Sequence, residues 1–435
     1  MDRDIRDQFG PAMVESEIED FLPTHPKLSE PAKRQFRPWH KPRKQFVRRK
    51  QWCLEIERLI ETTAFSPDNR VLRYLSLPSE DMLDVRTLAS TLNGDLKLKY
   101  LGFFYALGGS PDDQRMSISE KAIKGLGAVD ATSHVARDML EDTGNVKSPA
   151  YKTLKTHAPY HVVNIDLCNH FAAPRKANVY GCIDALQSIA EIQHEKTSGN
   201  SWLFFLTTRI QPDYFDVLHL RAFIDAIQAN VDVSEDFKAK LGEVFVQESH
   251  DLLKKLADLA EILEKTDPAN LKEARLSPGD VDALRCNAAA AIDNDTFRKF
   301  FCVGFGKWLL SFLAASTPQT KVEMLPSYFY AVGEDSQDML SLAFKCTPQI
   351  QPPRDRFQLA KPRQQQPKQP VSEPKQGMQI VKAASHLQDL DALLADSPEL
   401  MEAMIEESMQ FLAMADYDVN TYRDFFNTQD QVITA

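Results

Sequence analysis

One stretch near the amino terminus concentrates cationic and aromatic side chains. Residues 33–50 carry nine Lys or Arg and no Asp or Glu, and aromatic residues are interspersed from Phe36 to Trp52. Cations at this density neutralise phosphates, and aromatic rings offer faces on which unstacked bases can lie. We call residues 33–52 the basic segment. We expect nucleic acid to be contacted by eight of its residues: Arg37, Trp39, Lys41, Arg43, Lys44, Arg48, Arg49 and Lys50.

The basic segment also has features of a helix that enters the protein core. From Phe46 onward, apolar residues recur at helical spacing, at Cys53, Ile56, Leu59 and Ile60. In this alternative the aromatic rings face the core, and the cations are solvated or pair with carboxylates of the same chain.

The carboxyl-terminal part of the chain has the opposite charge. Residues 388–435 hold eleven Asp or Glu against the single cation Arg423, and Ser397-Pro398-Glu399 is a helix-start signal. Apolar residues follow at spacings of mostly three or four, which predicts an amphipathic helix. We expect this helix to bind a protein partner, or to fold back onto the basic segment, through Met401, Met404, Ile405, Met409 and Phe411. The remaining alternative is a final helix that packs on its own domain.

Asp166 is the strongest candidate for a catalytic side chain. It lies in the apolar run of residues 161–168, which is too short for a helix and predicts a buried strand. A carboxylate near the carboxyl end of a strand lies where open α/β sheets bind ligands. The alternative is that Asp166 caps the next segment by accepting hydrogen bonds from backbone amides.

Composition indicates a globular protein without a membrane span. The 435 residues are 43% hydrophobic and 26% charged, with a net charge of -11. No apolar run approaches the length that a bilayer requires, and the acidic start does not resemble a secretory signal. The six cysteines are scattered and form no CxxC pair, so we expect reduced thiols, no metal site and a cytoplasmic location.

Composition also divides the chain into regions. The stretch Pro348–Gln379 contains seven Pro and nine Gln, which predicts a segment without a packed core. We expect the following order: an acidic leader, 1–32; the basic segment with an entry helix, 33–69; an α/β domain, 70–347, with a helical insertion at about 230–315; a disordered Pro/Gln-rich linker, 348–385; and an acidic amphipathic tail, 386–435.

Within 70–347, short β-rich runs alternate with helical patterns. The runs at 71–77, 96–105, 161–168 and 202–210 predict parallel strands joined by crossover helices, one of them capped by Ser79. Two further runs, 322–332 and 339–346, flank a short polar turn and predict an antiparallel hairpin. The expected fold class is α/β: a Rossmann-like, mostly parallel sheet with a terminal hairpin and inserted helices, followed by a flexible linker and a C-terminal amphipathic helix.

This layout resembles the class I S-adenosylmethionine-dependent methyltransferase superfamily over residues 70–347. In that family a glycine-rich loop follows the first strand and an acid ends the second strand, whereas this chain has Leu77-Pro78-Ser79-Glu80-Asp81 and Gly102-Phe103-Phe104-Tyr105. At the later strand, Asn164 to Phe171 offers an acid and an aromatic residue but not the family's two prolines. The resemblance implies S-adenosylmethionine as a possible cofactor, with Ser79, Asp81 and Asp166 as candidate contacts, and the departures leave open whether the protein is an enzyme.

A second resemblance lies in FRPWHKPRKQFVRRKQW followed by LRYLSLPSEDMLDVR, which is similar to uncharacterised bacterial proteins associated with mobile elements and phage defence. Three functions follow as hypotheses. The first is a methyltransferase-like protein that binds nucleic acid through the basic segment and a protein through the acidic tail. The second is a divergent methyltransferase, and the third is a structural subunit of a multiprotein assembly.

Overall fold

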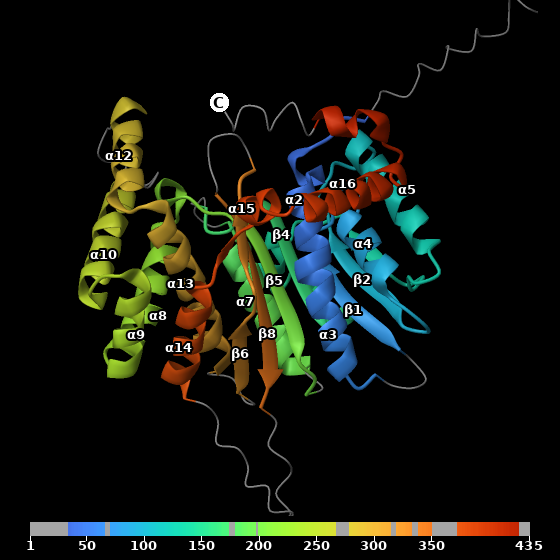
Figure 1. Cartoon of the computed structure of the whole chain (residues 1–435). Helices are drawn as coiled ribbons and strands as arrows, with labels where there is room; N and C mark the ends of the chain where they lie inside the picture. Colours follow the sequence, from blue (N-terminus) through green and yellow to red (C-terminus); the bar gives the residue numbers. More distant parts are fainter. Residues whose placement is uncertain are drawn as a thin grey trace, which may run out of the picture.

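The computed structural model describes residues 34–65, 70–173, 179–196, 199–266, 278–314, 319–332, 338–349 and 372–425. The expected acidic leader lies outside the described residues, and so do residues 350–371 of the expected linker. The described residues form an α/β protein in which helices flank one mixed sheet (Figure 1).

The sheet contains nine described strands in the order β3-β2-β1-β4-β5-β8-β7-β9, and β6 pairs with β8 beside β7. The strands are β1 (Val71–Ser76), β2 (Lys97–Phe103), β3 (His134–Ala136), β4 (Val162–His170), β5 (Trp202–Arg209), β6 (Thr320–Met324), β7 (Tyr328–Tyr330), β8 (Met339–Pro348) and β9 (Gln388–Asp389). The first five are parallel, and β8 is antiparallel to β5, β6 and β7. The order 3-2-1-4-5 is that of Rossmann folds, so the expected fold class is confirmed.

Both faces of the central strands are covered, which explains their continuous apolar sequences. Along β5, Phe204 and Leu206 pack into one core, whereas Leu203 and Phe205 pack into the other, because successive strand side chains point to opposite faces. The first core also contains α6 (Pro149–His157), α7 (Cys182–Lys196) and the helical insertion. The second core contains α3 (Leu54–Thr62), α4 (Leu83–Thr91), α5 (Pro111–Lys124) and parts of α15 (Leu390–Ala395) and α16 (Pro398–Ala413).

The helices between the strands and in the insertion are α4 (Leu83–Thr91), α5 (Pro111–Lys124), α6 (Pro149–His157), α7 (Cys182–Lys196), α8 (Val217–Val231), α9 (Glu235–Phe245), α10 (Ser249–Thr266), α12 (Pro278–Ala291) and α13 (Asn294–Ala314). The C-terminal described elements are α14 (Glu373–Ala384), α15 (Leu390–Ala395), α16 (Pro398–Ala413) and the 3-10 helix η5 (Val419–Thr421). None of the described helices is long and apolar enough to cross a membrane.

The basic segment forms a nearly continuous helical rod. It consists of η1 (Pro38–His40), α2 (Pro42–Phe46) and the π-helix η2 (Val47–Cys53), and it continues into α3 (Leu54–Thr62). Trp52 and Ile56 are buried against the sheet, as the helix-entry alternative requires. Figure 1 shows α16 alongside α2 and α4, so the two ends of the described chain lie on the same side of the sheet.

Three local expectations need correction. Helix α4 does not start at Ser79: its N-cap is Met82, in the left-handed region at φ 51°, because the preceding loop residues are held by other contacts. Residues 373–384 of the expected linker form α14, since Ile380, Val381 and Ala384 give it an apolar face that is buried. The run 322–332 is divided into β6 and β7 around Pro326, which lacks the N–H that a strand donates.

Candidate functional site

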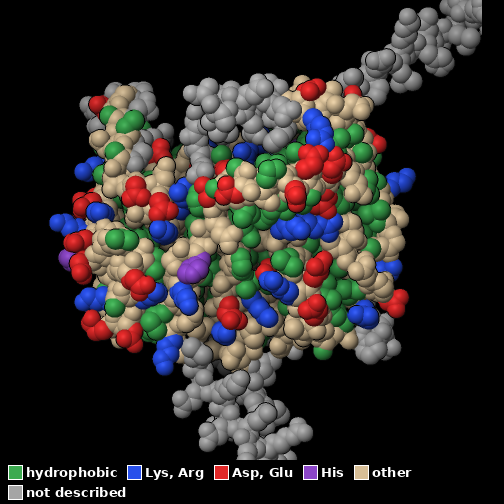
Figure 2. Space-filling view, viewed as in Figure 1, with side chains coloured by type: hydrophobic (Ala, Val, Ile, Leu, Met, Phe, Trp, Pro, Cys, Tyr) green, Lys and Arg blue, Asp and Glu red, His purple; other side chains and the backbone are tan. Residues whose placement is uncertain are grey.

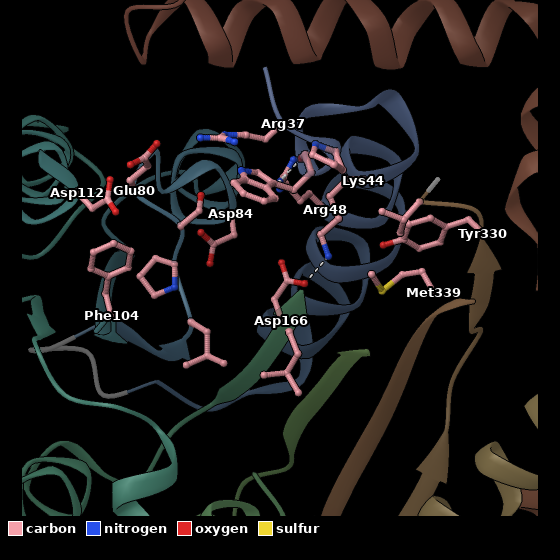
Figure 3. A pocket seen from close by; sticks show the side chains of 17 residues that line it. Arg37, Lys44, Arg48, Glu80, Asp84, Phe104, Asp112, Asp166, Tyr330 and Met339 are labelled. Atoms are coloured by element: carbon pink, nitrogen blue, oxygen red, sulfur yellow. Dashed lines mark hydrogen bonds and ion pairs between the residues drawn. The ribbon is translucent and has the colours of Figure 1, made fainter. Parts of the chain in front are cut away.

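A cavity of about 400 Å³ lies beside the carboxyl ends of β1 and β4 (Figure 3). The chain leaves β1 toward β2 on one side of the sheet and leaves β4 toward β5 on the other, so this is the topological switch point. Open α/β sheets bind their ligands at this position, because the two crossover connections diverge there and leave a crevice.

Carboxylates line the cavity on the side formed by the sheet and the helices that follow its strands. Glu80 lies in the loop after β1, Asp84 in the first turn of α4, Asp112 in the first turn of α5, and Asp166 in β4. In Figure 3 Glu80, Asp84 and Asp112 lie near Phe104, which follows β2. These acids therefore come from four separate elements that meet at one edge of the sheet.

Cations line the opposite side, and all of them belong to the basic segment. Arg37, Lys44 and Arg48 border the cavity together with Trp39. Lys44 donates to a carboxylate oxygen of Asp166 at 2.5 Å, and its ammonium lies 4.7 Å from the centre of the Trp52 ring. The cavity thus has one acidic and one basic wall, joined by the Lys44–Asp166 ion pair.

Apolar side chains complete the lining. They are Leu77 and Pro78 after β1, Phe104, Leu167 in β4, and Tyr330, Val332 and Met339 from the β7–β8 region. A cavity with apolar walls and a few convergent charged groups has the usual composition of a small-molecule site.

A hydrogen-bond network supports Asp84 from inside the protein. Asn164 Nδ2 donates to the Tyr74 hydroxyl at 2.7 Å, and this hydroxyl donates to Asp84 Oδ2 at 3.1 Å. Ser76 donates to the same oxygen. All four side chains are buried, and they come from β1, β4 and α4.

The pKa of Asp84 is raised above its ordinary value. Burial raises the pKa of Asp84, with a further contribution from the negative charge of Asp166, and the hydrogen bond from Ser76 and the positive charge of Arg48 only partly offset this. Burial also raises the pKa of Tyr74 well above its ordinary value, so this phenol keeps its proton. Asp84 is therefore the cavity carboxyl best suited to hold or transfer a proton.

The three residues that the methyltransferase resemblance singles out have different surroundings. Ser79 and Asp166 line the cavity. Asp81 does not line it: its side chain is 0% exposed and lies in an internal cluster. It accepts hydrogen bonds from Arg34 at 3.0 Å and Tyr417 at 2.9 Å, and it is 3.1 Å from His40 Nε2. Asp81 therefore joins the basic segment, the loop after β1 and the C-terminal segment, and a catalytic role for Asp166 stays a prediction.

Protonation in this cluster follows from competing effects. Burial opposes ionisation of Asp81, but the hydrogen bonds and charges of its partners outweigh burial and lower the pKa of this carboxyl. Burial lowers the pKa of His40, and Asp81 offsets this only in part. The cluster is consequently built around an ionised Asp81.

Half of the eight predicted nucleic-acid contacts are buried in the protein. Arg37 and Lys50 are exposed and Trp39 and Arg49 are partly buried, whereas the other four are buried: Lys41, Arg43, Lys44 and Arg48. Arg43 pairs with Asp391, and Arg49 Nε donates to Glu407 at 2.6 Å. Figure 2 shows acidic and basic side chains close together where α16 lies beside the basic segment. These contacts agree with the alternative in which the cations pair with carboxylates of the same chain. Nucleic-acid contact stays a prediction.

The five predicted partner-binding residues face the protein's own body to different degrees. Met404, Ile405 and Phe411 are buried, and Met401 and Met409 are partly buried against the same clusters. The cluster around Ile405 and Phe411 also contains Leu83 of α4 and Tyr422. Helix α16 thus packs on its own domain and folds back onto the basic segment, two arrangements that the sequence left open.

Several lining residues were not singled out from the sequence. Glu80 and Asp112 come after strands β1 and β2 in the sequence, and this position could have marked them as candidate site residues. Asp84 has no such signal, because its role depends on Tyr74, Ser76 and Asn164 beneath it. Tyr330 and Met339 reach the cavity only because β8 pairs with β5. Among the described residues, no three His, Cys, Asp or Glu side chains are grouped so that they could hold a metal ion.

The fold and this cavity define a Rossmann-like α/β protein with a pocket at the switch point of its sheet. The chain belongs to the PP_RS20740-like family, whose model matches residues 33–274 and 272–427. No curated protein and no solved structure is significantly similar to the chain.

Proposed function

We propose that this protein binds a nucleoside ligand in the switch-point cavity, and that S-adenosylmethionine is this ligand. The observation that carries the proposal is the acidic wall of the cavity, where Glu80 and Asp112 lie close together after β1 and β2 and both pair with Arg115. Carboxylates at this edge accept hydrogen bonds from ribose hydroxyls in Rossmann folds. We choose S-adenosylmethionine among the possible nucleosides because the chain resembles S-adenosylmethionine-dependent methyltransferases.

The lining fits this group in three respects. Phe104, Pro78 and Leu77 offer apolar surface for an adenine ring, and the two carboxylates offer acceptors for the ribose. The further carboxyl groups of Asp84 and Asp166 offer hydrogen-bond acceptors for the ammonium group of the ligand. When bound, S-adenosylmethionine supplies an electrophilic methyl group, and Asp84 is the side chain placed to take a proton from an acceptor.

The loop after β1 reaches this arrangement without glycine. Met82 takes the left-handed backbone conformation, φ 51°, in a loop where the resembled family uses glycines. A non-glycine residue in this region carries strain that surrounding contacts must hold, and such strain concentrates at functional sites. Burial of Met82 and the contacts of Asp81 supply that support.

Titration calorimetry with S-adenosylmethionine tests the proposal. We expect the full-length protein to bind it, and the double variant Glu80→Gln, Asp112→Asn to bind about tenfold or more weakly, because two acceptors for ribose hydroxyls lose their charge. The matched control is Glu195→Gln, an exposed carboxylate that pairs with Lys155 away from the cavity. Absence of binding at millimolar ligand, or equal affinity of the double variant, would overturn the proposal.

A second candidate function is nucleic-acid binding at the mouth of the cavity. The observation that favours it is the exposed Arg37, which borders the cavity next to Trp39. Nucleic acid would then meet the protein at this mouth and at Lys50, and not along the whole basic segment. Charge reversal of Arg43 or Arg49 would break internal ion pairs, so these positions cannot test the idea.

The informative variant is Arg37→Glu combined with Lys50→Glu, because both side chains are exposed. If they contact phosphates, retention of single-stranded DNA or RNA should weaken and the salt slope should decrease by about 0.7 per lost contact. Arg58→Glu, which lies on α3 and is 58% exposed, is the matched control. Identical binding by the double variant and the unaltered protein would remove this candidate.

A further inference from the structure

Arg48 differs from the other buried arginine of the basic segment. Its side chain is 4% exposed, yet among the residues that the structure describes no carboxylate lies within ion-pair distance of it, and its charge acts on Asp84 only from farther away. One terminal nitrogen donates to the Trp39 carbonyl oxygen at 3.0 Å, and the other is 3.5 Å from the Gln45 side-chain oxygen. In contrast, Arg43 pairs with Asp391. A buried guanidinium is always charged and normally has a counter-charge.

Two buried donors beside the cavity have no acceptor within the described residues. They are Arg48 Nε and Trp39 Nε1, and both residues line the cavity. A buried donor without an acceptor destabilises the folded protein, and an acceptor on a bound molecule would remove this cost. Figure 3 places Arg48 in the cavity wall and Arg37 above it at the mouth.

The three residues therefore form a cationic part of the cavity lining, which the basic segment supplies. Arg37 supplies an exposed guanidinium, Arg48 a buried one, and Trp39 a neutral N–H donor. An oxyanion with several acceptor atoms matches this set, because guanidinium groups bind phosphate and carboxylate with paired, charge-assisted hydrogen bonds. A cation or a purely apolar group would leave these donors unsatisfied.

We propose that Arg48, Arg37 and Trp39 Nε1 form an oxyanion subsite, which holds a phosphate group of a second compound beside S-adenosylmethionine or of a nucleotide in its place. The subsite adds an anion-binding part to the proposed ligand site. It rests on the proposed function only for the nucleoside part of the ligand. It requires a ligand with two chemically different ends: a neutral or cationic end toward Glu80 and Asp112, and an anionic end toward Arg48. A nucleoside phosphate, or a phosphorylated acceptor beside S-adenosylmethionine, satisfies this requirement.

Anion-dependent thermal stability tests the subsite without a nucleoside. Inorganic phosphate should raise the melting temperature of the full-length protein above that in chloride of equal ionic strength, because an anion that binds only the folded state stabilises it. The rise should be lost in Arg48→Met and reduced in Arg37→Met, while Arg48→Lys should retain part of it. Arg221→Met, an exposed arginine of α8 that pairs with Glu264, is the matched control and should keep the full rise.

Calorimetry with adenosine and adenosine monophosphate separates the subsite from the nucleoside proposal. We expect the phosphate to increase affinity about tenfold in the unaltered protein and to add nothing in Arg48→Met. The thermal-stability measurement is repeated with acetate in place of phosphate. If acetate stabilises the protein and phosphate does not, the subsite binds a carboxylate, and the assignment of phosphate is overturned. If phosphate stabilises through Arg48 but neither S-adenosylmethionine nor adenosine binds, the nucleoside proposal fails and the subsite stands. If neither anion has an effect, or if Arg48→Met keeps it, the subsite is refuted.

Discussion

Two clusters of buried side chains hold this protein together by different forces. The aromatic cluster joins the helical insertion to the sheet and consists of Phe204, Phe223, Phe301, Phe305 and Phe344. The charged cluster joins the basic segment, the loop after β1 and the C-terminal segment and consists of Arg34, His40, Asp81 and Tyr417. The first depends on apolar burial, whereas the second depends on ionisation and hydrogen-bond geometry. The stability that the charged cluster provides should therefore respond to pH.

The largest expected effect is in the aromatic cluster. Phe305 is fully buried, with its ring centre 6.1 Å from that of Phe301 and 5.7 Å from that of Phe344. Phe305→Ala should lower the free energy of unfolding by about 3–5 kcal/mol, because it removes apolar contacts and leaves a cavity. Urea denaturation measures this, with Leu218→Ala, a 63% exposed position on α8, as the control expected within about 0.5 kcal/mol of the unaltered protein. Equal effects at the two positions would contradict the assignment of the insertion to the core.

The charged cluster should respond to loss of its central carboxylate. Asp81→Asn leaves Arg34 without its counter-charge, and we expect a loss of about 3 kcal/mol in the free energy of unfolding. Tyr417→Phe removes one hydrogen bond to the same carboxylate and should lower it by about 1 kcal/mol. Amide hydrogen exchange should show faster exchange in α16 for Asp81→Asn, and unchanged exchange there would mean that Asp81 does not hold the C-terminal segment.

A change in pH should alter the free energy of unfolding by a smaller amount per pH unit than these substitutions do. Burial lowers the pKa of His40, and burial together with the charge of Arg73 lowers the pKa of His161 to about 4. Below the ordinary value of 6.5 the unfolded chain binds protons at these residues and the folded protein does not, so the free energy of unfolding should fall as pH falls. Each group contributes at most about 1.4 kcal/mol per pH unit. For His161 this window extends from 6.5 down to about 4.

Urea denaturation at several pH values checks the sign and the origin of this effect. His161→Asn should reduce the pH dependence between 6.5 and 4, since the titrating group is removed while an acceptor for the Arg73 N–H is retained. Phe305→Ala should lower stability equally at all these pH values, because the aromatic cluster does not titrate. A pH dependence that is unchanged in His161→Asn would assign the effect to other groups.

The smallest expected effect is at the partly exposed pair between the basic segment and α16. Arg49 and Glu407 have side chains 27% and 15% exposed, so solvent screens their attraction. Arg49→Met and Glu407→Gln should each change the free energy of unfolding by less than about 1 kcal/mol. A double-mutant cycle measures the coupling energy between Arg49 and Glu407. A coupling energy as large as the loss expected for Asp81→Asn would contradict this prediction.

The sequence predicted the strands well where apolar runs were long and bounded by turns. β2, β4, β5 and β8 begin and end within two residues of their expected limits, and the antiparallel pairing of β8 was foreseen. Helix α14 was missed, because the Pro and Gln content before it masks an apolar face that is apparent only from residue 377 onward. The late start of α4 was missed because Asp81 and Met82 are held by residues far away in the sequence.

The sequence by itself determined the order of the long strands, the strong basic and acidic character of the two ends, and the place of Asp166 near a strand's carboxyl end. Those properties depend on local spacing and composition, which a single chain displays directly. Only the tertiary structure decided where each charge lies. It pairs Arg43 with Asp391 and Arg49 with Glu407, and it leaves Arg48 buried beside the cavity. Such pairings join residues more than three hundred positions apart, and they follow from the packing of α15 and α16 on the basic segment, which no local pattern encodes.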